Sequence, residues 1–187
     1  MPQNLRVLIT GGTGLLGKSL LEGAPGDVQS WATYHQRPPP VEWQDRFSPL
    51  ELRSVSSVDQ SIRKVQPHVV IHTASIGSVD EAEQDPERVR AVNQDGTRRL
   101  AQACRQVGAR LVFISSNAVF DGTKPPYSEE DPPCPINRYG AIKAETEREL
   151  HQGGHQSLIV RPILLYGWPL GGARDNAVTR WVNALER

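Results

Sequence analysis

Residues 5–17, LRVLITGGTGLLG, decide the fold. The apolar residues before the first glycine have the length of a buried strand, and the leucines after it recur at helical spacing. Gly11, Gly14 and Gly17 have the spacing of a dinucleotide-binding turn, where they reverse the chain, admit a pyrophosphate and let the helix pack closely on the strand. A glycine-rich turn without a ligand is the alternative, and the strand-to-helix setting disfavours it. We therefore expect the first amides of the helix to face an anion.

Strands and helices alternate through the rest of the chain. The predicted strands are residues 5–9, 28–34, 50–52, 68–73, 110–115 and 157–161. The predicted helices are residues 15–21, 57–65, 85–107, 139–150 and 178–185, with Ser57 and Asp85 as N-caps, and the proline-rich residues 121–135 are expected to form an ordered surface loop. This alternation predicts an α/β protein with a doubly wound parallel sheet, a Rossmann fold of strand order 3-2-1-4-5-6 with right-handed crossovers.

Length and charge narrow the class of protein. The 187 residues suit one full domain and little more, so we expect residues 1–187 to form one NAD(P)-binding domain. Lys and Arg number 21, as do Asp and Glu, and this balance gives no overall field for nucleic acid or an anionic membrane, although a local basic patch is not excluded. No apolar stretch reaches the roughly 18 residues of a membrane span, and a core strand begins near the N-terminus in place of a signal peptide. These features indicate a cytoplasmic protein.

The two cysteines do not indicate a metal site or a disulfide framework. Cys104 lies in a helical pattern and Cys134 among prolines, with neither the spacing of metal ligands nor the density of a disulfide-rich protein. We expect free thiols and no metal.

The exit of the second strand is where this fold binds the adenosine ribose. An acidic residue about twenty positions after the glycines holds the ribose 2′-hydroxyl of NAD, whereas an arginine nearby accommodates the 2′-phosphate of NADP. The chain has His35, Gln36 and Arg37 at this place and no acid. A solvated surface arginine is the alternative interpretation of Arg37. We therefore expect NADP as the cofactor, with NAD possible.

Small polar residues follow two strands that should be neighbours in the sheet. Thr73 and Ala74 end one strand, and Ser116 and Asn117 follow the next. Open α/β sheets bind ligands at the carboxyl ends of their strands. We therefore expect these residues to line one cofactor crevice, whereas His72 is expected to be a packed histidine with one satisfied nitrogen.

A serine, a tyrosine and a lysine could carry proton transfer at this edge of the sheet. Tyr139 and Lys143 are four residues apart in a predicted helix and therefore share a face. A nearby ammonium stabilises a phenolate and brings the pKa of a tyrosine from about 10 toward physiological pH. Ser116 would hold a carbonyl oxygen while Tyr139 gives it a proton. A Tyr and Lys at this spacing also occur by chance, but the glycine turn in the same chain favours the chemical interpretation.

Six segments in this order carry a family resemblance: GGTGLLG, HTAS, VNQDGT, SSNAVFDG, YGAIK and RPILLYG. Over roughly residues 5–167 the chain resembles the extended (atypical) short-chain dehydrogenase/reductase family. The resemblance implies that Tyr139 is the acid/base, that Lys143 binds the nicotinamide ribose and lowers the tyrosine pKa, and that Ser116 is the hydroxyl residue of the triad. It also implies these cofactor contacts: Thr13, Gly14, Leu15 and Leu16 to the pyrophosphate, His35, Gln36 and Arg37 to the adenosine ribose, Thr73 to the cofactor, and Pro162 and Ile163 on the nicotinamide side.

Within that family the chain resembles two groups with different activities. One is the dTDP-4-dehydrorhamnose reductases, which implies an NADP-dependent reductase of a keto group on a nucleotide sugar. The other is the NADP-binding regulatory subunit of methionine adenosyltransferase, which implies a non-catalytic cofactor-binding partner on the same scaffold. Asn117 stands where the reductase group usually has aspartate, and it keeps the shape but loses the charge. A homo-oligomer or a complex with a regulatory partner is compatible with either resemblance.

The resemblance also implies a further domain. Family members continue for about a hundred residues, an ordinary domain size, to form a C-terminal substrate domain. Residues 163–187 would lead into this domain, which is absent or truncated here, so the chain is a truncated product or a piece of a longer protein. The identity of the substrate is therefore left open.

Overall fold

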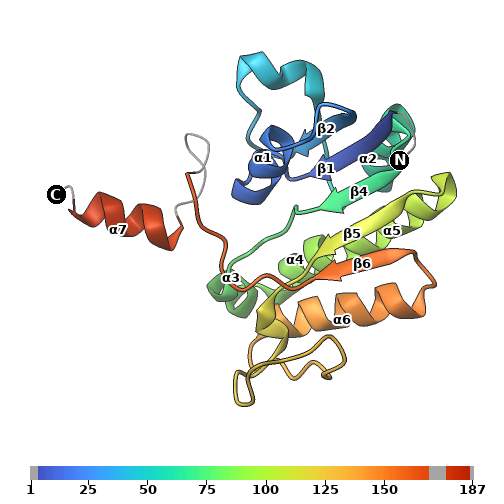
Figure 1. The fold of residues 1–187 in the computed structure, drawn as a ribbon. Helices are drawn as coiled ribbons and strands as arrows, with labels where there is room; N and C mark the ends of the chain where they lie inside the picture. Colours follow the sequence, from blue (N-terminus) through green and yellow to red (C-terminus); the bar gives the residue numbers. More distant parts are fainter. Residues whose placement is uncertain (1–3, 169–175, 186–187) are drawn as a thin grey trace.

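A single parallel sheet organises the molecule. The computed structural model describes residues 4–168 and 176–185. In these residues six parallel strands have the order β3-β2-β1-β4-β5-β6 (Figure 1). The strands are β1 Leu5–Thr10, β2 Val28–Tyr34, β3 Phe47–Pro49, β4 Val69–His72, β5 Arg110–Ile114 and β6 Ser157–Val160. The predicted fold class and strand order are confirmed.

Helices connect the strands and cover the sheet. They are α1 Leu15–Glu22, η1 Val41–Arg46, α2 Val55–Val65, α3 Val79–Gln84, α4 Pro86–Arg90, η2 Ala91–Asp95, α5 Gly96–Val107, η3 Asn117–Val119, α6 Arg138–Gln152 and α7 Ala177–Leu185. Right-handed crossovers place α1 on one face and α2, α5 and α6 on the other, because the strand order reverses after β3. The two halves of the sheet therefore meet between β1 and β4.

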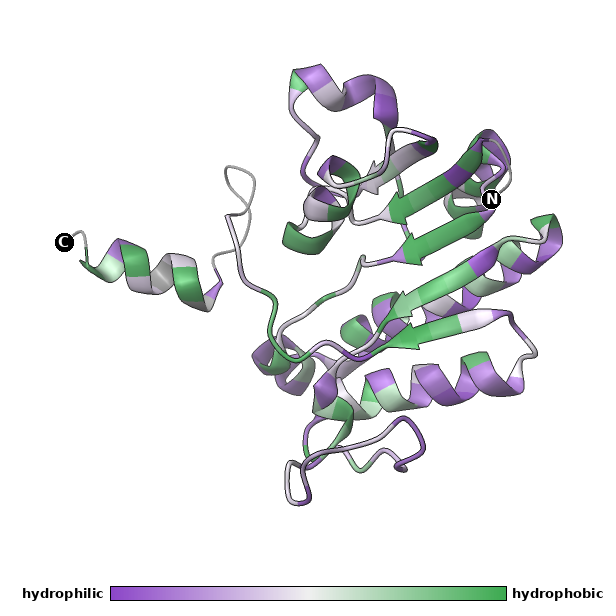
Figure 2. Ribbon diagram, in the orientation of Figure 1, coloured by the Kyte–Doolittle hydropathy of each residue, from purple (hydrophilic) through white to green (hydrophobic). Residues whose placement is uncertain are grey.

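Two hydrophobic cores lie on opposite faces of the sheet. The larger core joins strand residues to α2, α5 and α6 and includes Leu8, Val70, Leu111, Phe113, Ile62, Leu100 and Leu150. The smaller core includes Val7, Ile9, Leu21, Ala32 and Phe47. Neighbouring strand residues point to opposite faces, so one strand supplies both cores. In Figure 2 the inner strands are accordingly hydrophobic almost throughout, whereas α5 and α6 each show a hydrophilic side.

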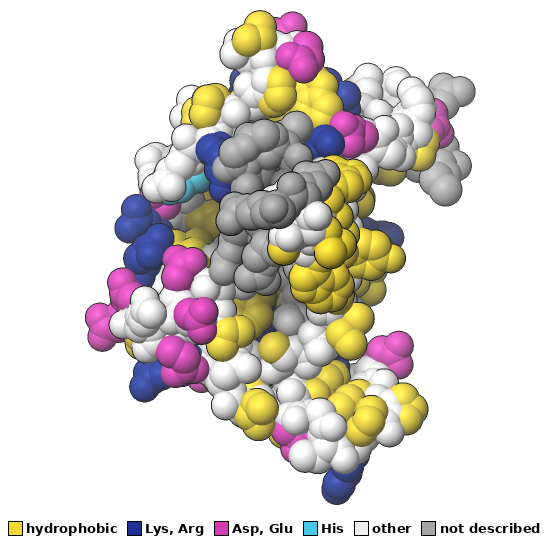
Figure 3. Space-filling view, turned by 90° about the vertical axis from the view of Figure 1, so that its left-hand side faces the viewer, with side chains coloured by type: hydrophobic (Ala, Val, Ile, Leu, Met, Phe, Trp, Pro, Cys, Tyr) yellow, Lys and Arg dark blue, Asp and Glu magenta, His cyan; other side chains and the backbone are white. Residues whose placement is uncertain are grey.

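One part of the sheet has no cover within the described residues. Ile159 of β6 packs on the larger core, but Leu158 and Val160, which point the other way, are 62% and 38% exposed. We call these two residues the open face of β6. α7 extends away from the sheet in Figure 1, and its Trp181 and Leu185 are also exposed. Figure 3, which faces the side from which α7 extends, shows hydrophobic side chains gathered there.

The short third strand is displaced from the predicted residues 50–52. It is Phe47–Pro49, which pairs with β2 from Ala32↔Phe47 to Tyr34↔Pro49. Leu50 and Leu52 are buried in the larger core instead. The prediction was wrong because the apolar residues marked burial rather than strand pairing.

Several helix boundaries also differ from the prediction. The N-cap of α2 is Ser54, whose hydroxyl accepts a hydrogen bond from the Ser57 amide at 3.3 Å, so the predicted cap Ser57 lies inside the helix. The predicted helix 85–107 has its expected cap, Asp85, but it is divided into α4, the π-helical η2 and α5. The short α3 was not predicted. The described residues 121–135 form no helix, as predicted. Residues 169–175, which lie between β6 and α7, are not among the described residues.

Candidate cofactor and catalytic site

The glycine turn has the three spatial properties predicted from its spacing. Gly11 has φ +72°, and a Cβ there would lie 2.9 Å from the Ala74 backbone. A Cβ on Gly17 would lie 2.3 Å from the carbonyl oxygen of Gly11, so only glycine allows α1 to approach the turn. A Cβ on Gly14 would meet only that same carbonyl oxygen, at 3.2 Å. The space above Gly14 is therefore open to a ligand.

The start of α1 fits an anionic group. Gly14 is the N-cap of α1 and offers no side-chain hydrogen bond to the first-turn amides. Thr13, Leu15 and Leu16 are partly buried beside it. An open glycine surface and amides without a side-chain cap are what a pyrophosphate requires at a helix N-terminus. These residues would hold a dinucleotide here.

Gly12 is a structural requirement that the spacing did not indicate. Its Cβ would lie 2.4 Å from the Cβ of Ala32, and its amide donates to the Thr33 carbonyl at 2.7 Å. The turn is therefore fixed against β2 by Gly12 and against Ala74 by Gly11. A pair of adjacent glycines was the available signal, but sequence alone does not separate their roles.

The residues predicted to contact the adenosine ribose lie together at the exit of β2. His35, Gln36 and Arg37 are all exposed. The structure adds Glu51, whose carboxylate lies 3.0 Å from Nε2 of His35 and 2.9 Å from a guanidinium nitrogen of Arg53. Hydrogen bonds from Arg53 lower the pKa of Glu51 to about 2. An acid is therefore absent along the exit of β2 but present nearby in space, with its charge engaged by Arg53.

The end of β4 lies directly against the glycine turn. The Thr73 hydroxyl donates to the Thr10 carbonyl at 2.6 Å, and the Ala74 amide donates to the Thr10 hydroxyl at 3.3 Å. Ala74 also bounds the space beside Gly11. The structure thus brings Thr73 and Ala74 to the turn from more than sixty residues away.

His72 is a packed histidine, but both of its ring nitrogens have partners. Nδ1 lies 2.6 Å from the Thr10 hydroxyl, and Nε2 lies 2.9 Å from the Thr97 hydroxyl. The Thr97 hydroxyl donates to the Asn93 carbonyl at 2.6 Å, so it accepts from Nε2, which carries the proton. Complete burial, with a contribution from the Lys143 charge, lowers the pKa of His72 to about 3. The histidine is neutral and joins β1, β4 and α5.

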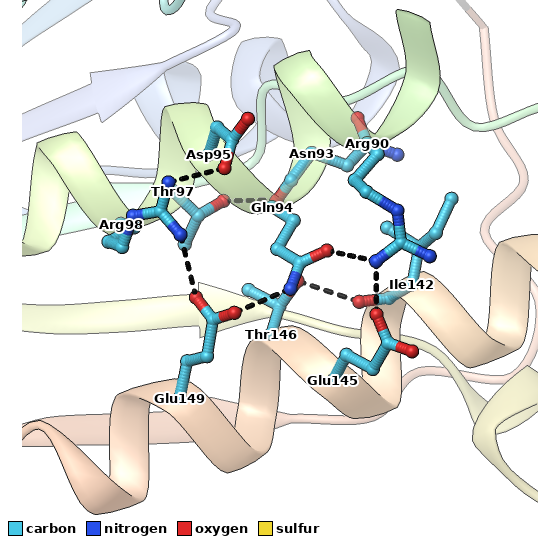
Figure 4. Close-up of polar contacts among 10 residues, drawn as sticks. All are labelled: Arg90, Asn93, Gln94, Asp95, Thr97, Arg98, Ile142, Glu145, Thr146 and Glu149. Carbon is cyan, nitrogen blue, oxygen red and sulfur yellow. Dashed lines mark hydrogen bonds and ion pairs between the residues drawn. The ribbon is translucent and has the colours of Figure 1, made fainter. Parts of the chain in front are cut away.

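The VNQDGT segment holds the loop after β4 and fastens α5 to α6. Asn93 accepts a hydrogen bond from the Ile76 amide at 2.8 Å and donates to its carbonyl at 2.9 Å. Gln94 accepts from Arg90 at 2.6 Å and donates to Glu149 of α6 at 2.5 Å (Figure 4). Further contacts across this seam join Arg90 to Glu145 and Arg98 to Glu149. The helix that carries Tyr139 and Lys143 is therefore held in a fixed position.

The three predicted catalytic side chains converge. Ser116 is the N-cap of η3, where its hydroxyl accepts from the Ala118 amide at 3.1 Å, and it lies near enough to Tyr139 to lower the pKa of that phenol. Asn137 caps α6 by accepting from the Gly140 amide at 2.8 Å. A Cβ on Gly140 would lie 2.0 Å from the Ala118 carbonyl oxygen, so Gly140 lets the start of α6 approach η3 closely. This requirement was not predicted, although the glycine after Tyr139 was visible in the sequence.

Lys143 is buried beneath Tyr139. Its Nζ donates to the Ile114 carbonyl at 2.9 Å and lies 4.8 Å from the centroid of the Phe113 ring and 5.9 Å from that of Tyr139. Burial lowers the pKa of Lys143 to about 8, opposed by the negative charge of Glu147. The ammonium remains the main form at neutral pH.

The expected depression of the tyrosine pKa is wrong for this structure. Burial raises the pKa of Tyr139, and the Ser116 hydroxyl opposes that rise only in part. The Lys143 ammonium donates to a backbone carbonyl instead of to the phenol oxygen. Tyr139 is therefore a fully protonated phenol at neutral pH, ready to donate a proton.

The residues after β6 complete the edge of the site. The Pro162 carbonyl accepts a hydrogen bond from the Asn117 amide at 3.0 Å, which ties this segment to the Ser116 loop. Ile163 is exposed. Just before them, Arg161 forms hydrogen bonds to both carboxylate oxygens of Glu147, at 3.1, 3.2 and 2.7 Å. Glu147 was not predicted as part of the site.

Two kinds of feature are absent from the residues that the structure describes. Among them, no group of three or more His, Cys, Asp or Glu side chains is arranged to hold a metal ion. The described helices also include none with the length and apolar character needed to cross a membrane. Both cysteines are free thiols, Cys104 buried and Cys134 exposed.

The chain is similar to two kinds of curated protein. Methionine adenosyltransferase 2 subunit beta of Pongo abelii is 36% identical over 165 residues, which are 88% of this chain and 48% of that protein. A dTDP-4-dehydrorhamnose reductase of Sinorhizobium fredii (strain NBRC 101917 / NGR234) is 33% identical over 163 residues, 87% of this chain and 51% of that protein. The chain thus spans about half the length of the curated relatives it matches.

A solved structure and a family model agree with this result. The crystal structure of dTDP-4-dehydrorhamnose reductase from Bacillus anthracis str. Ames in complex with NADP superposes with a TM-score of 0.83 at 32% identity, covering 98% of this chain and 61% of that one. The family model described as "RmlD substrate binding domain" matches residues 5–187. Together with the glycine turn and the Ser116, Tyr139 and Lys143 cluster, these matches show that the chain belongs to the RmlD substrate binding domain family.

Proposed function

We propose that this chain is the NADP-binding domain of a reductase that acts on a keto group of a nucleotide sugar. The observation that carries the proposal is the convergence of Ser116, Tyr139 and the buried Lys143, whose Nζ lies 5.9 Å from the centroid of the Tyr139 ring. This cluster lies at the sheet edge that also holds the open glycine turn. Residues 1–187 form the dinucleotide-binding domain, and residues 163–187 lead toward a substrate domain.

Each side chain has a distinct part in the proposed reduction. NADPH supplies the hydride when bound. The Ser116 hydroxyl holds the ketone oxygen, and Tyr139 donates a proton to that oxygen as the hydride arrives at the carbon. A raised tyrosine pKa suits this direction, since the acid must be protonated beforehand. The Lys143 ammonium then stabilises the phenolate that remains.

The cofactor preference rests on the exit of β2. Arg37 supplies a positive charge there. The carboxylate of the nearby Glu51 binds the Arg53 guanidinium and the His35 ring. A 2′-phosphate is therefore favoured over a bare ribose. The Bacillus anthracis reductase, crystallised with NADP, supports this choice. NAD remains the second cofactor to test.

A regulatory role is the second candidate function. The exposed Asn117 follows Ser116 without the negative charge of an aspartate, and the Pongo abelii relative is a subunit of methionine adenosyltransferase. In this role the chain binds NADP and a protein partner but does not turn over a ketone. In either role the protein is proposed to be cytoplasmic, and a homo-oligomer is compatible with both.

Two measurements separate these functions. The chain is titrated with NADPH by fluorescence and then assayed with a panel of 4-keto nucleotide sugars, with Tyr139→Phe as the matched control. Turnover that is lost in Tyr139→Phe supports the reductase. NADPH binding with no turnover, together with a stoichiometric complex with a methionine adenosyltransferase catalytic subunit on gel filtration, supports the regulatory role. Failure to bind NADPH contradicts both.

A further inference from the structure

We infer that Arg161 is a positioning residue for Lys143. By binding both oxygens of Glu147, Arg161 keeps that carboxylate from capturing the Lys143 ammonium, which stays at the edge of the sheet where the dinucleotide is proposed to bind. The inference rests on the proposed function only for the ligand that Lys143 meets. Lys143, Glu147 and Arg161 are all present in the chain, so their arrangement does not depend on a bound ligand.

Lys143 and Glu147 are placed to form an ion pair with each other. They are four residues apart on α6 and share a face, and both are buried with 2% exposure. Opposite charges at this spacing attract each other, although the order of Lys before Glu is the less favourable one. Here the ammonium donates to the Ile114 carbonyl at 2.9 Å, and the carboxylate binds the Arg161 guanidinium at 2.7 Å. Each charge has a different partner from the one expected on the helix.

The fork of arginine explains this exchange of partners. Nε of Arg161 reaches both Glu147 oxygens, at 3.1 and 3.2 Å, and Nη2 donates to one of them. A guanidinium satisfies a buried carboxylate through two parallel hydrogen bonds, whereas an ammonium acts as a point charge. Because the buried carboxylate has this partner, it does not draw the ammonium toward itself. Among the described residues the Lys143 ammonium donates to the Ile114 carbonyl, and the other two of its three donors can serve groups at the sheet edge.

Arg161 is itself held rigidly. Its guanidinium lies 5.0 Å from the centroid of the Phe120 ring, and that ring stacks on Tyr127 with a centroid separation of 4.2 Å. The Tyr127 hydroxyl donates to Asp121 at 2.6 Å. The next residue, Pro162, accepts from the Asn117 amide. The arginine thus belongs to the same framework as the Ser116 loop and does not follow Glu147 as a mobile surface charge would.

The titratable and charged groups around Lys143 come from three parts of the chain. His72 on β4 is neutral, Tyr139 and Glu147 lie on α6, and Arg161 follows β6. Glu147 is the negative charge that faces the ammonium, and it raises the Lys143 pKa against the effect of burial. Removing Arg161 brings the carboxylate and the ammonium together, so the Lys143 pKa rises. Removing Glu147 makes it fall.

The first experiment measures the Lys143 pKa by NMR of the full chain labelled at lysine Cε. We expect an increase in Arg161→Met and a decrease in Glu147→Gln, with no change in the exposed-arginine control Arg148→Met. If Arg161→Met does not fold by circular dichroism, Arg161→Lys, which keeps the charge but loses the fork, is measured instead. An unchanged Lys143 pKa in the folded Arg161 variant overturns the inference, whether or not the chain binds a dinucleotide.

The second experiment measures NADPH affinity. Arg161→Met is expected to weaken NADPH binding by about ten-fold, since it withdraws hydrogen bonds from a charged donor. The double variant Arg161→Met/Glu147→Gln is expected to regain most of that affinity, because no carboxylate is left to capture Lys143. A purely structural role predicts that the double variant binds no better than Arg161→Met, which would contradict the inference. Absence of NADPH binding in the unmodified chain refutes the proposed function and leaves the NMR measurement to decide this inference.

Discussion

At the scale of single residues, burial has a larger effect on the pKa of Tyr139 than its neighbours do. Tyr139 has a raised pKa although a lysine lies one helical turn away, because the phenol is desolvated and the Lys143 ammonium is directed to a carbonyl. Motif spacing predicted which residues meet but not the direction of that pKa. Desolvation depends on what packs around the phenol, which the spacing of a motif does not contain.

The assignment of Tyr139 predicts a division between binding and turnover. Tyr139→Phe should reduce ketone turnover by about 10²–10⁴-fold while NADPH affinity stays unchanged, because it removes one proton donor and keeps the ring. Lys143→Ala should impair both quantities. Steady-state kinetics and fluorescence titration of a chain with measurable turnover check this. Turnover by Tyr139→Phe at the unmodified rate would refute the acid assignment.

Arg37 predicts the cofactor preference. A charge-assisted contact to a phosphate contributes about 1.5–3 kcal/mol, so Arg37→Ala should remove most of the discrimination between NADP and NAD. Fluorescence titration with both cofactors measures the ratio of affinities. Arg63→Ala, an exposed arginine on α2, is the control and should leave the ratio as it is. Equal affinities in the unmodified chain would contradict the expectation.

Gly14 predicts a binding defect without a folding defect. Gly14→Val should abolish dinucleotide binding while the chain still folds with a small loss of melting temperature, since its Cβ lies 3.2 Å from the Gly11 carbonyl oxygen and meets nothing else within 4 Å. Gly26→Val is the matched control because a Cβ there meets nothing within 4 Å, and it should bind normally. Gly17→Val should unfold the turn. Calorimetry and titration of the three variants distinguish a glycine that is needed for ligand binding from one that is needed for packing.

At the scale of elements, long apolar runs were predictable and contacts between segments were not. The strands before the turn and before Thr73 followed from their apolar residues, and their parallel order followed from the alternation with helices. α3 was missed because its six residues, VDEAEQ, have little apolar periodicity. Gly12, Gly140 and Glu51 were missed because each acts on a partner distant in the sequence.

The hydrogen bonds that join β1, β4 and α5 through His72 predict a dependence of stability on pH. The folded pKa of His72 is about 3, below its ordinary value of 6.5, so the unfolded chain binds more protons between these values. The contribution of His72 to the free energy of unfolding is complete above pH 6.5. It is lost as the pH drops below that value, by at most about 1.4 kcal/mol per pH unit. Urea denaturation at pH 7.5 and 5 measures this loss.

A substitution identifies the histidine responsible. His72→Gln should flatten the pH dependence at the expense of stability at pH 7.5. His155, whose pKa is also lowered by burial, is only partly buried, and His155→Gln should leave most of the pH dependence in place. If His155→Gln flattened the pH dependence of stability more than His72→Gln did, His72 would not be the group that titrates.

At the scale of the whole molecule, polar and apolar surfaces are unevenly distributed. α5 and α6 each have a hydrophilic side (Figure 2), whereas the open face of β6, α7 and residues Ile163, Leu164 and Tyr166 expose apolar side chains. Figure 3 shows hydrophobic side chains gathered on the side from which α7 extends. Contiguous apolar surface of this kind is uncommon on an isolated monomer. Sequence composition did not indicate this apolar surface, because buried and exposed apolar residues contribute equally to the composition.

The open face of β6 has a consequence for the colloidal behaviour of this chain. Its formal net charge is +0 at pH 7 and its isoelectric point is about 7.0, so two copies experience no net electrostatic repulsion at neutral pH. Repulsion is what ordinarily keeps sticky surfaces apart. Light scattering should therefore rise most steeply with concentration near pH 7 and fall again as the pH moves to either side, and Leu158→Lys, which charges that face, should shift the maximum of scattering upward in pH and reduce its height.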